Sequence, residues 1–310
     1  MRILPFFRVS LGLNTKVDPV RLQYDPESGA QFLAEAVNVD IDPTGRISRR
    51  QGLREIAEVT DPHSIWATKD QTAGFVIVGD SLYSLTVAGT MSAIKDGLTV
   101  GAAGHFCEVG QDVYFSNGTD IGIIRNRQTW EEWEETPYTG PETDRNFTGP
   151  SAGTHLFVFR GRLFYATSNF LIYSEPFNYG CFDPARNFLP IPGGSILMTH
   201  PIENGFFVSS DKGVYFIDGP VPSEFGFKHA LPYPVVPGTT AVSVYAEQVM
   251  DGVQGEAVLF MAQYAGLCIG LGDGTVIRLM ESRMDMPPAS AGCAVLNAAN
   301  NMQYITFLEV

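Results

Sequence analysis

Residues 156–173, LFVFRGRLFYATSNFLIY, decide the fold of this 310-residue chain. Three apolar and aromatic runs are separated by the polar turns Arg160-Gly161 and Ser168-Asn169. Runs of β-branched and aromatic residues bounded by Gly or Asn are typical of short strands joined by hairpin turns. We therefore predict three consecutive antiparallel strands in this stretch.

The same pattern recurs along the chain. Similar units cover residues 63–88, 104–125, 153–174, 195–218 and 241–279. Their polar turns lie 37, 52, 42 and 55 residues apart, at Asp80, Asn117, Asn169, Asp211 and Gly266. Repeats of roughly 40–50 residues built from about four short strands are typical of a β-propeller. A β-sandwich is the alternative.

The two ends of the chain favour the propeller. After residue 291 only two further strands are predicted, residues 293–296 and 303–308, which amount to half a blade. Near the N-terminus, residues 36–41 and 46–49 flank the turn Asp42-Pro43-Thr44-Gly45 and predict a hairpin. Pairing this hairpin with the C-terminal strands would complete a blade and remove exposed edges. We predict an all-β propeller of about six blades over residues 36–310, closed by this pairing.

Residues 1–35 remain outside this propeller as an extended N-terminal arm. Within it, only residues 28–36 show the spacing of a short helix. The apolar residues of positions 11–26 follow no helix or strand period, so this segment either covers its own propeller or orders itself against a neighbouring chain. We favour the neighbour and predict interface residues Leu13, Asn14, Val17, Leu22 and Tyr24.

The composition excludes disorder and argues against strong binding to polyanions. Hydrophobic residues make up 45% of the chain, and 34 acidic against 20 basic residues give a formal charge of −14. Because binding to a phosphate backbone requires cations, such a chain is a poor candidate for gripping DNA or an anionic membrane. DNA could still slide past it. No secretion signal or membrane span is visible, and the four separated cysteines indicate buried free thiols.

No sequence motif indicates catalysis, a cofactor or a metal ion. The segment Asp40-x-Asp42-x-Thr44-Gly45 resembles the start of a calcium loop, but the closing position is Gln51. Residues 149–153 match G-x-S-x-G, yet they precede a strand instead of a helix. The five histidines are tens of residues apart, although two of them could meet across a propeller channel. We therefore predict no catalytic residue, no cofactor and no metal ion.

Residues 130–135, WEEWEE, have the most unusual local composition of the chain, with two tryptophans among four acidic residues. Trp130 and Trp133 could form a binding patch, because tryptophan supplies contact area and surrounding acids select the partner. The alternative, which we favour, is a loop between blades whose tryptophans wedge between sheets while the acids stay in water. Both tryptophans are kept as candidate interface residues.

Two stretches resemble structural proteins of tailed bacteriophages, in particular the propeller-type nozzle or tail tubular proteins of short-tailed phages. They are Gly12-Leu13-Asn14 with residues 33–42 and 45–52, and residues 161–166 with 171–176. The resemblance implies a non-enzymatic virion component, made in the host cytoplasm, that forms a homo-oligomeric ring. It also implies contacts with portal, adaptor or other tail proteins, and DNA that exits through the ring without specific binding. The known nozzles are larger and have extra domains, so the position in the virion stays open.

Two other functions remain open from the residues alone. One is a propeller enzyme that acts on glycans or lactones, with acids or a calcium ion at the mouth of the channel. The other is a monomeric propeller that docks peptides through Trp130 and Trp133.

Overall fold

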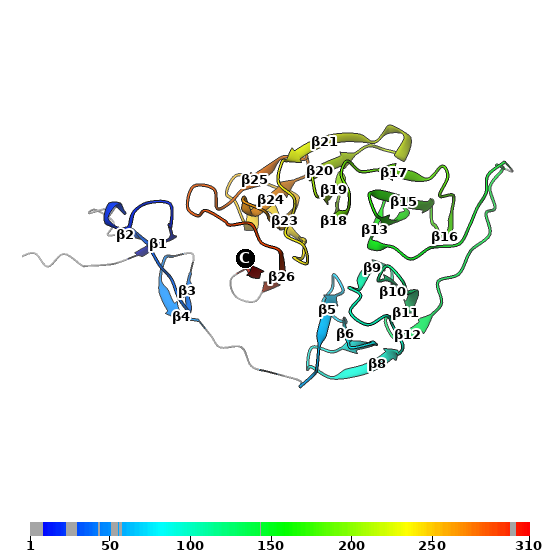
Figure 1. Ribbon diagram of the computed structural model, residues 1–310, viewed down its shortest axis with the longest axis horizontal. Helices are drawn as coiled ribbons and strands as arrows, with labels where there is room; N and C mark the ends of the chain where they lie inside the picture. Colours follow the sequence, from blue (N-terminus) through cyan, green and yellow to red (C-terminus); the bar gives the residue numbers. More distant parts are fainter. Residues whose placement is uncertain are drawn as a thin grey trace, which may run out of the picture. The chain divides into compact units, whose positions relative to one another are not determined.

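The computed structural model describes residues 9–22, 30–42, 44–50, 55, 58–142, 144–297 and 302–310. Nearly all of the regular structure in them is β-strand (Figure 1). The chain divides into two compact units, each described by itself. The large unit comprises residues 55–234 and 272–274, and the small unit comprises residues 1–54, 235–271 and 275–310.

The large unit consists of four consecutive antiparallel sheets in which strand order follows the chain, except that β17 of the third sheet pairs with β15. The first sheet contains β5 (Pro62–Ala67), β6 (Gly74–Val78), β7 (Ser81–Leu85) and β8 (Met91–Lys95). The second contains β9 (His105–Val109), β10 (Asp112–Ser116), β11 (Ile121–Arg125) and β12 (Thr129–Glu131). The third contains β13 (Thr154–Phe159), β14 (Arg162–Thr167), β15 (Phe170–Glu175), β16 (Asn178–Phe182) and β17 (Phe188–Pro190), and the fourth β18 (Ile196–Ile202), β19 (Gly205–Ser210), β20 (Gly213–Asp218) and β21 (Gly226–Leu231).

The hairpin turns follow from the residues that form them. Between β13 and β14, Arg160 and Gly161 have φ values of 47° and 72°. Two successive left-handed residues match the right-handed twist of the flanking strands, and glycine adopts this conformation at little cost. The three strands predicted over residues 156–173 are thereby confirmed as β13, β14 and β15.

The core of the large unit lies between consecutive sheets. One cluster joins the first and second sheets through Phe75 and Phe115, and another joins the third and fourth through Phe164 and Phe206. The first strands also meet, because β13 contacts both β9 and β18. Four-stranded meanders that pack face to face with their first strands together are the arrangement of a β-propeller. The chain is thus an all-β protein of the propeller type.

The small unit contains a fifth four-stranded sheet. It is formed by β22 (Val242–Tyr245), β23 (Glu256–Ala262), β24 (Gly266–Leu271) and β25 (Val276–Arg278). Among the described residues, β26 (Ala291–Asn297) pairs with β27 (Gln303–Glu309) and with no other strand. Leu296 and Tyr304 of this pair pack against Leu259 and Ile269 of the sheet.

The N-terminal elements of the small unit differ from two of our expectations. The hairpin predicted around residues 42–45 exists as β3 (Val39–Ile41) and β4 (Ile47–Arg49), with Pro43 outside the described residues. It forms a separate two-stranded sheet and is not paired with β26 or β27 among the described residues. Its turn contacts β1 instead, where Ser10 N donates to Gly45 O at 2.8 Å.

The second difference concerns the predicted short helix at residues 28–36. Its described part is a strand, β2 (Ala30–Leu33), which pairs in parallel with β1 (Val9–Leu13). Pairing with β1 outweighs the weak helical preference of so short a segment. The boundary that we place at residue 35 between arm and propeller stays a prediction.

Three 3-10 helices, η1 (Pro19–Arg21), η2 (Pro222–Glu224) and η3 (Ala246–Gln248), complete the described regular structure. No helix in the described part of the chain combines the length and the hydropathy that a membrane crossing requires.

Gly153, directly before β13, provides a test of the packing within the third sheet. A Cβ on this residue would lie 2.6 Å from Ala166 O and 2.6 Å from Tyr165 Cδ2. Because a backbone oxygen cannot move aside, we expect Gly153→Ala to lower the free energy of unfolding by about 1–3 kcal/mol. The control is Gly194→Ala, whose Cβ would find its nearest neighbour at 3.7 Å. Chemical denaturation of both variants measures the difference, and equal stabilities would contradict the packing described here.

Candidate functional site: histidines on the first strands

Four of the five histidines lie on the first strands of successive sheets in the large unit. His63 is on β5, His105 on β9, His155 on β13 and His200 on β18. Since β13 contacts both β9 and β18, the last three of these strands are neighbours. The sheet repeat thus brings together residues that are tens of positions apart in sequence.

His105 and His155 are in direct contact. Their ring centroids are 4.4 Å apart and their planes are inclined by 38°. From the sequence, two histidines could meet across a propeller channel; the contact seen here joins rings on the neighbouring strands β9 and β13. The sequence analysis did not identify which histidines meet, although each of the four lies within the first six residues of a repeat unit. Aligning the repeats would have provided that signal.

The backbone at this site adopts an unusual conformation. Ser64 and His155 both have a φ of 56°, and both lie where the register of a first strand shifts. A left-handed residue at a β-bulge redirects its side chain and costs free energy, so such positions often occur at functional sites. The Ser64 hydroxyl accepts from Gly104 N at 2.8 Å and contacts His63 Nδ1 at 2.8 Å, linking the first sheet to the start of the second.

Burial determines the protonation of these rings. Desolvation lowers the pKa of His105 to about 4 and that of His200 to about 4. For His155, desolvation and then the neighbouring His105 lower the pKa to about 3. Near neutral pH all three imidazoles are therefore uncharged. Two buried ring nitrogens, His63 Nε2 and His155 Nδ1, have no hydrogen-bond partner in the part of the chain that the structure describes.

The site does not extend to a complete set of metal ligands in the described part of the chain. No group of three or more His, Cys, Asp or Glu side chains is arranged there to hold an ion. The calcium-like segment instead forms a hairpin turn, in which Asp42 Oδ1 accepts from Thr44 N, Thr44 Oγ1 and Arg46 N. Residues 149–153 lie in the loop before β13, as expected.

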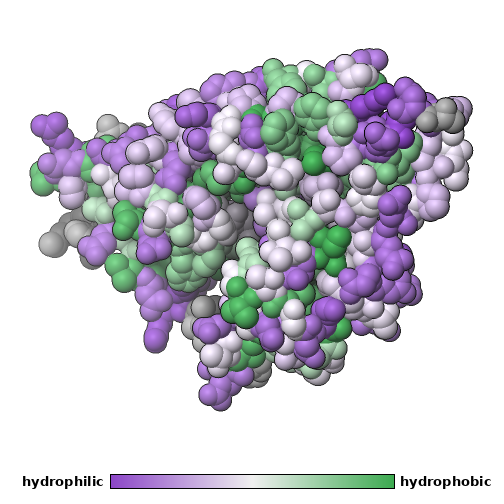
Figure 2. Space-filling model, turned by 45° about the vertical axis from the view of Figure 1, so that its right-hand side comes forward, coloured by the Kyte–Doolittle hydropathy of each residue, from purple (hydrophilic) through white to green (hydrophobic). Residues whose placement is uncertain are grey.

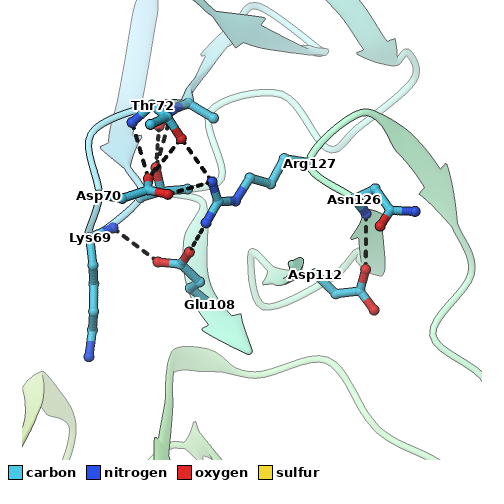
Figure 3. A network of polar contacts seen from close by, with 9 residues as sticks. Lys69, Asp70, Thr72, Glu108, Asp112, Asn126 and Arg127 are labelled. Atoms are coloured by element: carbon cyan, nitrogen blue, oxygen red, sulfur yellow. Dashed lines mark hydrogen bonds and ion pairs between the residues drawn. The ribbon is translucent and has the colours of Figure 1, made fainter. Parts of the chain in front are cut away.

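A charged network links the first two sheets of the large unit (Figure 3). Arg127 donates to Asp70 at 2.8 Å and to Glu108 on β9, and Glu108 also accepts from Lys69 N at 3.0 Å. The Thr68 hydroxyl and then Arg127 hold the pKa of Asp70 far below its usual range. The ends of β5 and β9 are thus fixed relative to each other within this unit.

A second network anchors the long excursion of residues 132–153 between β12 and β13 (Figure 1). The side chain of Arg145 is 9% exposed and donates to Asp183 at 2.9 Å and to Glu175 at 2.6 Å. Further along, Tyr138 stacks on Phe147 with centroids 4.0 Å apart. Long loops with their own internal packing are often functional. This excursion exposes acidic side chains, namely Glu134, Glu135, Glu142 and Asp144.

The two tryptophans of residues 130–135 pack between sheets. Trp133 is 4% exposed, and its Nε1 donates to Tyr179 O at 3.0 Å. Trp130 is half-buried, packs against the cluster of the first two sheets and lies under Lys95 Nζ at 5.5 Å. The wedge interpretation that we favoured matches these contacts, and Trp133 offers no accessible ring as an anchor in a single chain.

The five candidate interface residues of the N-terminal segment have mixed exposure. Leu13 and Leu22 are half-buried, Asn14 is buried, Val17 is exposed and Tyr24 lies outside the described residues. The segment is held to residues 280–286 of the small unit. Thr15 N donates to Arg283 O at 2.8 Å, and Lys16 pairs with Asp285 at 3.0 Å.

No protein-family model and no curated protein matches the sequence. Solved β-propeller structures do match it. BBS1N, from its complex with ARL6DN, has a TM-score of 0.51 at 10% identity, with 87% of this chain and 83% of that chain covered. An auxiliary nutrient binding protein from Bacteroides ovatus has a TM-score of 0.51 at 7% identity, with coverages of 79% and 66%. At these identities the likeness concerns the fold alone.

Stability should depend on pH through the buried histidines. Each pKa is lower in the folded chain than the usual 6.5, so below pH 6.5 the unfolded state binds protons that the folded state excludes. Above that pH the buried histidines therefore do not reduce the free energy of unfolding, and this free energy falls as the pH drops toward 4. Each group lowers the free energy of unfolding by an amount on the order of 2 kcal/mol at pH 5.

Thermal unfolding of the wild type and of His155→Gln between pH 7 and 5 tests this pH dependence. We expect a shallower pH dependence in the variant, with the exposed His229→Gln as control, and an unchanged slope would contradict the assignment.

Replacing the buried Arg145 should cost more unfolding free energy than replacing an exposed arginine. Arg145→Leu leaves the carboxylates of Asp183 and Glu175, which are 2% and 10% exposed, without their cation. We expect a loss of about 3–5 kcal/mol in unfolding free energy. The matched control is Arg186→Leu, which removes an exposed pair with Asp144 and should cost less than about 1 kcal/mol. Denaturant titration measures the unfolding free energy of both variants, and similar losses would contradict the larger contribution expected of Arg145.

Proposed function

We propose that this protein is a structural component of a bacteriophage virion that forms an oligomeric ring in the tail or head-to-tail conduit. The observation that carries the proposal is the set of strands outside the complete sheets. β1 with β2, β3 with β4, and β26 with β27 form three two-stranded sheets at the two ends of the chain. Two-stranded sheets have little independent stability and leave edges open. Strands of this kind suit a protein that completes itself in an assembly.

The surface is consistent with assembly through edges and polar contacts. On the face shown in Figure 2, hydrophobic side chains are interspersed with hydrophilic ones and do not form one continuous patch. The acidic excursion of residues 132–153 adds a second contact surface, which is anchored to the third sheet through Arg145. Its charge would select basic regions on a neighbouring subunit or on portal, adaptor and other tail proteins.

The net charge fits a conduit for DNA. With −14 charges per chain, a ring would repel the phosphate backbone and let DNA pass without specific binding. The protein would be made in the host cytoplasm and located in the virion, with no role for a membrane or a cofactor.

An enzyme is the second candidate, favoured by the contact between His105 and His155 on neighbouring first strands. A general base works best when its pKa is near the operating pH. Desolvation lowers the pKa values of these rings to about 4 and about 3, so both are weak bases at neutral pH. This makes hydrolysis of glycans or lactones a poorer fit than a structural role.

Virion composition and mass measurement test the structural role. We expect the chain to be present in purified phage particles in a stoichiometric number of copies. We also expect the isolated chain to be larger than a monomer in light scattering at micromolar concentration. Imaging of the particles should place it in the tail. Absence of the chain from purified particles would remove the proposal, and hydrolytic activity lost in His155→Gln would support the enzyme instead.

A further inference from the structure

The strand pair β26–β27 has the properties of half a sheet that lacks its other half. The side chains of alternate residues point to two faces. On one face, Leu296, Tyr304 and Leu308 pack into the core of the small unit. On the other, Cys293 is exposed, and so are Val295 at 54% and Phe307 at 62%.

One edge of this pair is open. Strand β26 is contacted at its start, where Gly292 N donates to Pro237 O at 2.9 Å. Strand β27 pairs with β26 and with no other strand of the described residues. An edge of seven residues with apolar neighbours is a template for a further strand.

The hairpin β3–β4 is a matching half. It is also a two-stranded sheet with open edges, and adding it to β26–β27 would give the four-stranded unit seen in β5–β8, β9–β12, β18–β21 and β22–β25. Val39, Ile41 and Ile47 lie on one face of the hairpin and would extend the apolar face of Val295 and Phe307. Exposed Arg49 on β4 and exposed Glu309 on β27 are complementary in charge.

In a single chain the hairpin is held elsewhere. Its turn binds β1 through Gly45 O, and the segment after β1 is bound to Arg283 O through Thr15 N. On its other side, residues 50–61 separate β4 from β5. When extended, such a connection spans roughly 40 Å, which is long enough to place the hairpin on another molecule.

We propose that the hairpin β3–β4 of one copy adds to the free edge of β27 in a second copy, so that each copy completes its last sheet with strands from its neighbour. The inference rests on the proposed ring, because a head-to-tail exchange of this kind repeats from copy to copy and closes only in a ring. Main-chain hydrogen bonds along β27 supply affinity, and the apolar face and the Arg49–Glu309 charges set the register.

Cysteine cross-linking between two full-length chains tests the exchange. One population has Arg49→Cys and the other has Phe307→Cys, and both have Cys293→Ser so that the exposed native thiol is removed. After mixing and treatment with a short bis-maleimide, we expect mixed cross-linked dimers. Their yield should exceed that of a Phe177→Cys control by about tenfold or more, because paired strands hold the two thiols at a high effective concentration. Phe177 is 80% exposed and lies in the large unit.

Three results would overturn the exchange, and each bears differently on the ring. A yield equal to that of the control, with oligomers still present in light scattering, overturns the strand exchange and leaves the ring intact. Cross-linking only within single chains that have both Arg49→Cys and Phe307→Cys shows closure inside one copy instead. A wild-type chain that is monomeric at every concentration and absent from virions overturns both proposals. Far-ultraviolet circular dichroism of each variant shows whether it is folded.

Discussion

Packing of aromatic side chains between consecutive sheets is the interaction on which the large unit depends. Phe157, Phe164 and Phe206 form one such contact, with ring centroids 4.8 to 5.6 Å apart. A four-stranded meander has two faces and cannot bury either alone, so each sheet requires the next one. A small residue at a point of close approach, Gly104, follows from the same requirement, because a Cβ there would lie 2.7 Å from Ile77 Cδ1 of the first sheet and 2.9 Å from Phe115 Cε2 of the second. The position of every first strand, and so of the histidines, follows from this packing.

The parts of the fold that depend on local residues were predictable from the sequence. The turn Arg160-Gly161 and its flanking aromatic runs specify β13 and β14 through backbone conformation and alternation alone. The segment Ala30–Leu33 was predicted as a helix because its pairing with β1 depends on residues about twenty positions away. The position of the N-terminal hairpin was missed for a similar reason, since its turn contacts Ser10, about thirty-five positions away, and no local pattern indicates that contact.

The candidate site was predictable only in part. The wide spacing of the histidines contains no local signal for their contact, because the meeting of His105 and His155 depends on the shared role of β9 and β13 in two different sheets. The left-handed φ of His155 could not be predicted from the sequence, because histidine is enriched at positive φ but adopts it only in a minority of cases. A histidine held in that conformation by its surroundings is a consequence of tertiary packing.

The small unit and the large unit differ in the kind of polar group that they leave without a hydrogen-bond partner inside the chain. Among the described residues of the large unit, the buried polar atoms without a partner are His63 Nε2, Arg127 Nε and His155 Nδ1, and the burial of His155 makes the stability sensitive to acid. In the small unit, three two-stranded sheets have edges that pair with no other strand of the described residues. Water can satisfy those edges in an isolated chain, but the exposed Val295 and Phe307 beside them gain only when another surface covers them. In the proposed strand exchange, the apolar residues would therefore provide the net driving force, while the edge hydrogen bonds would mainly determine which strand is accepted.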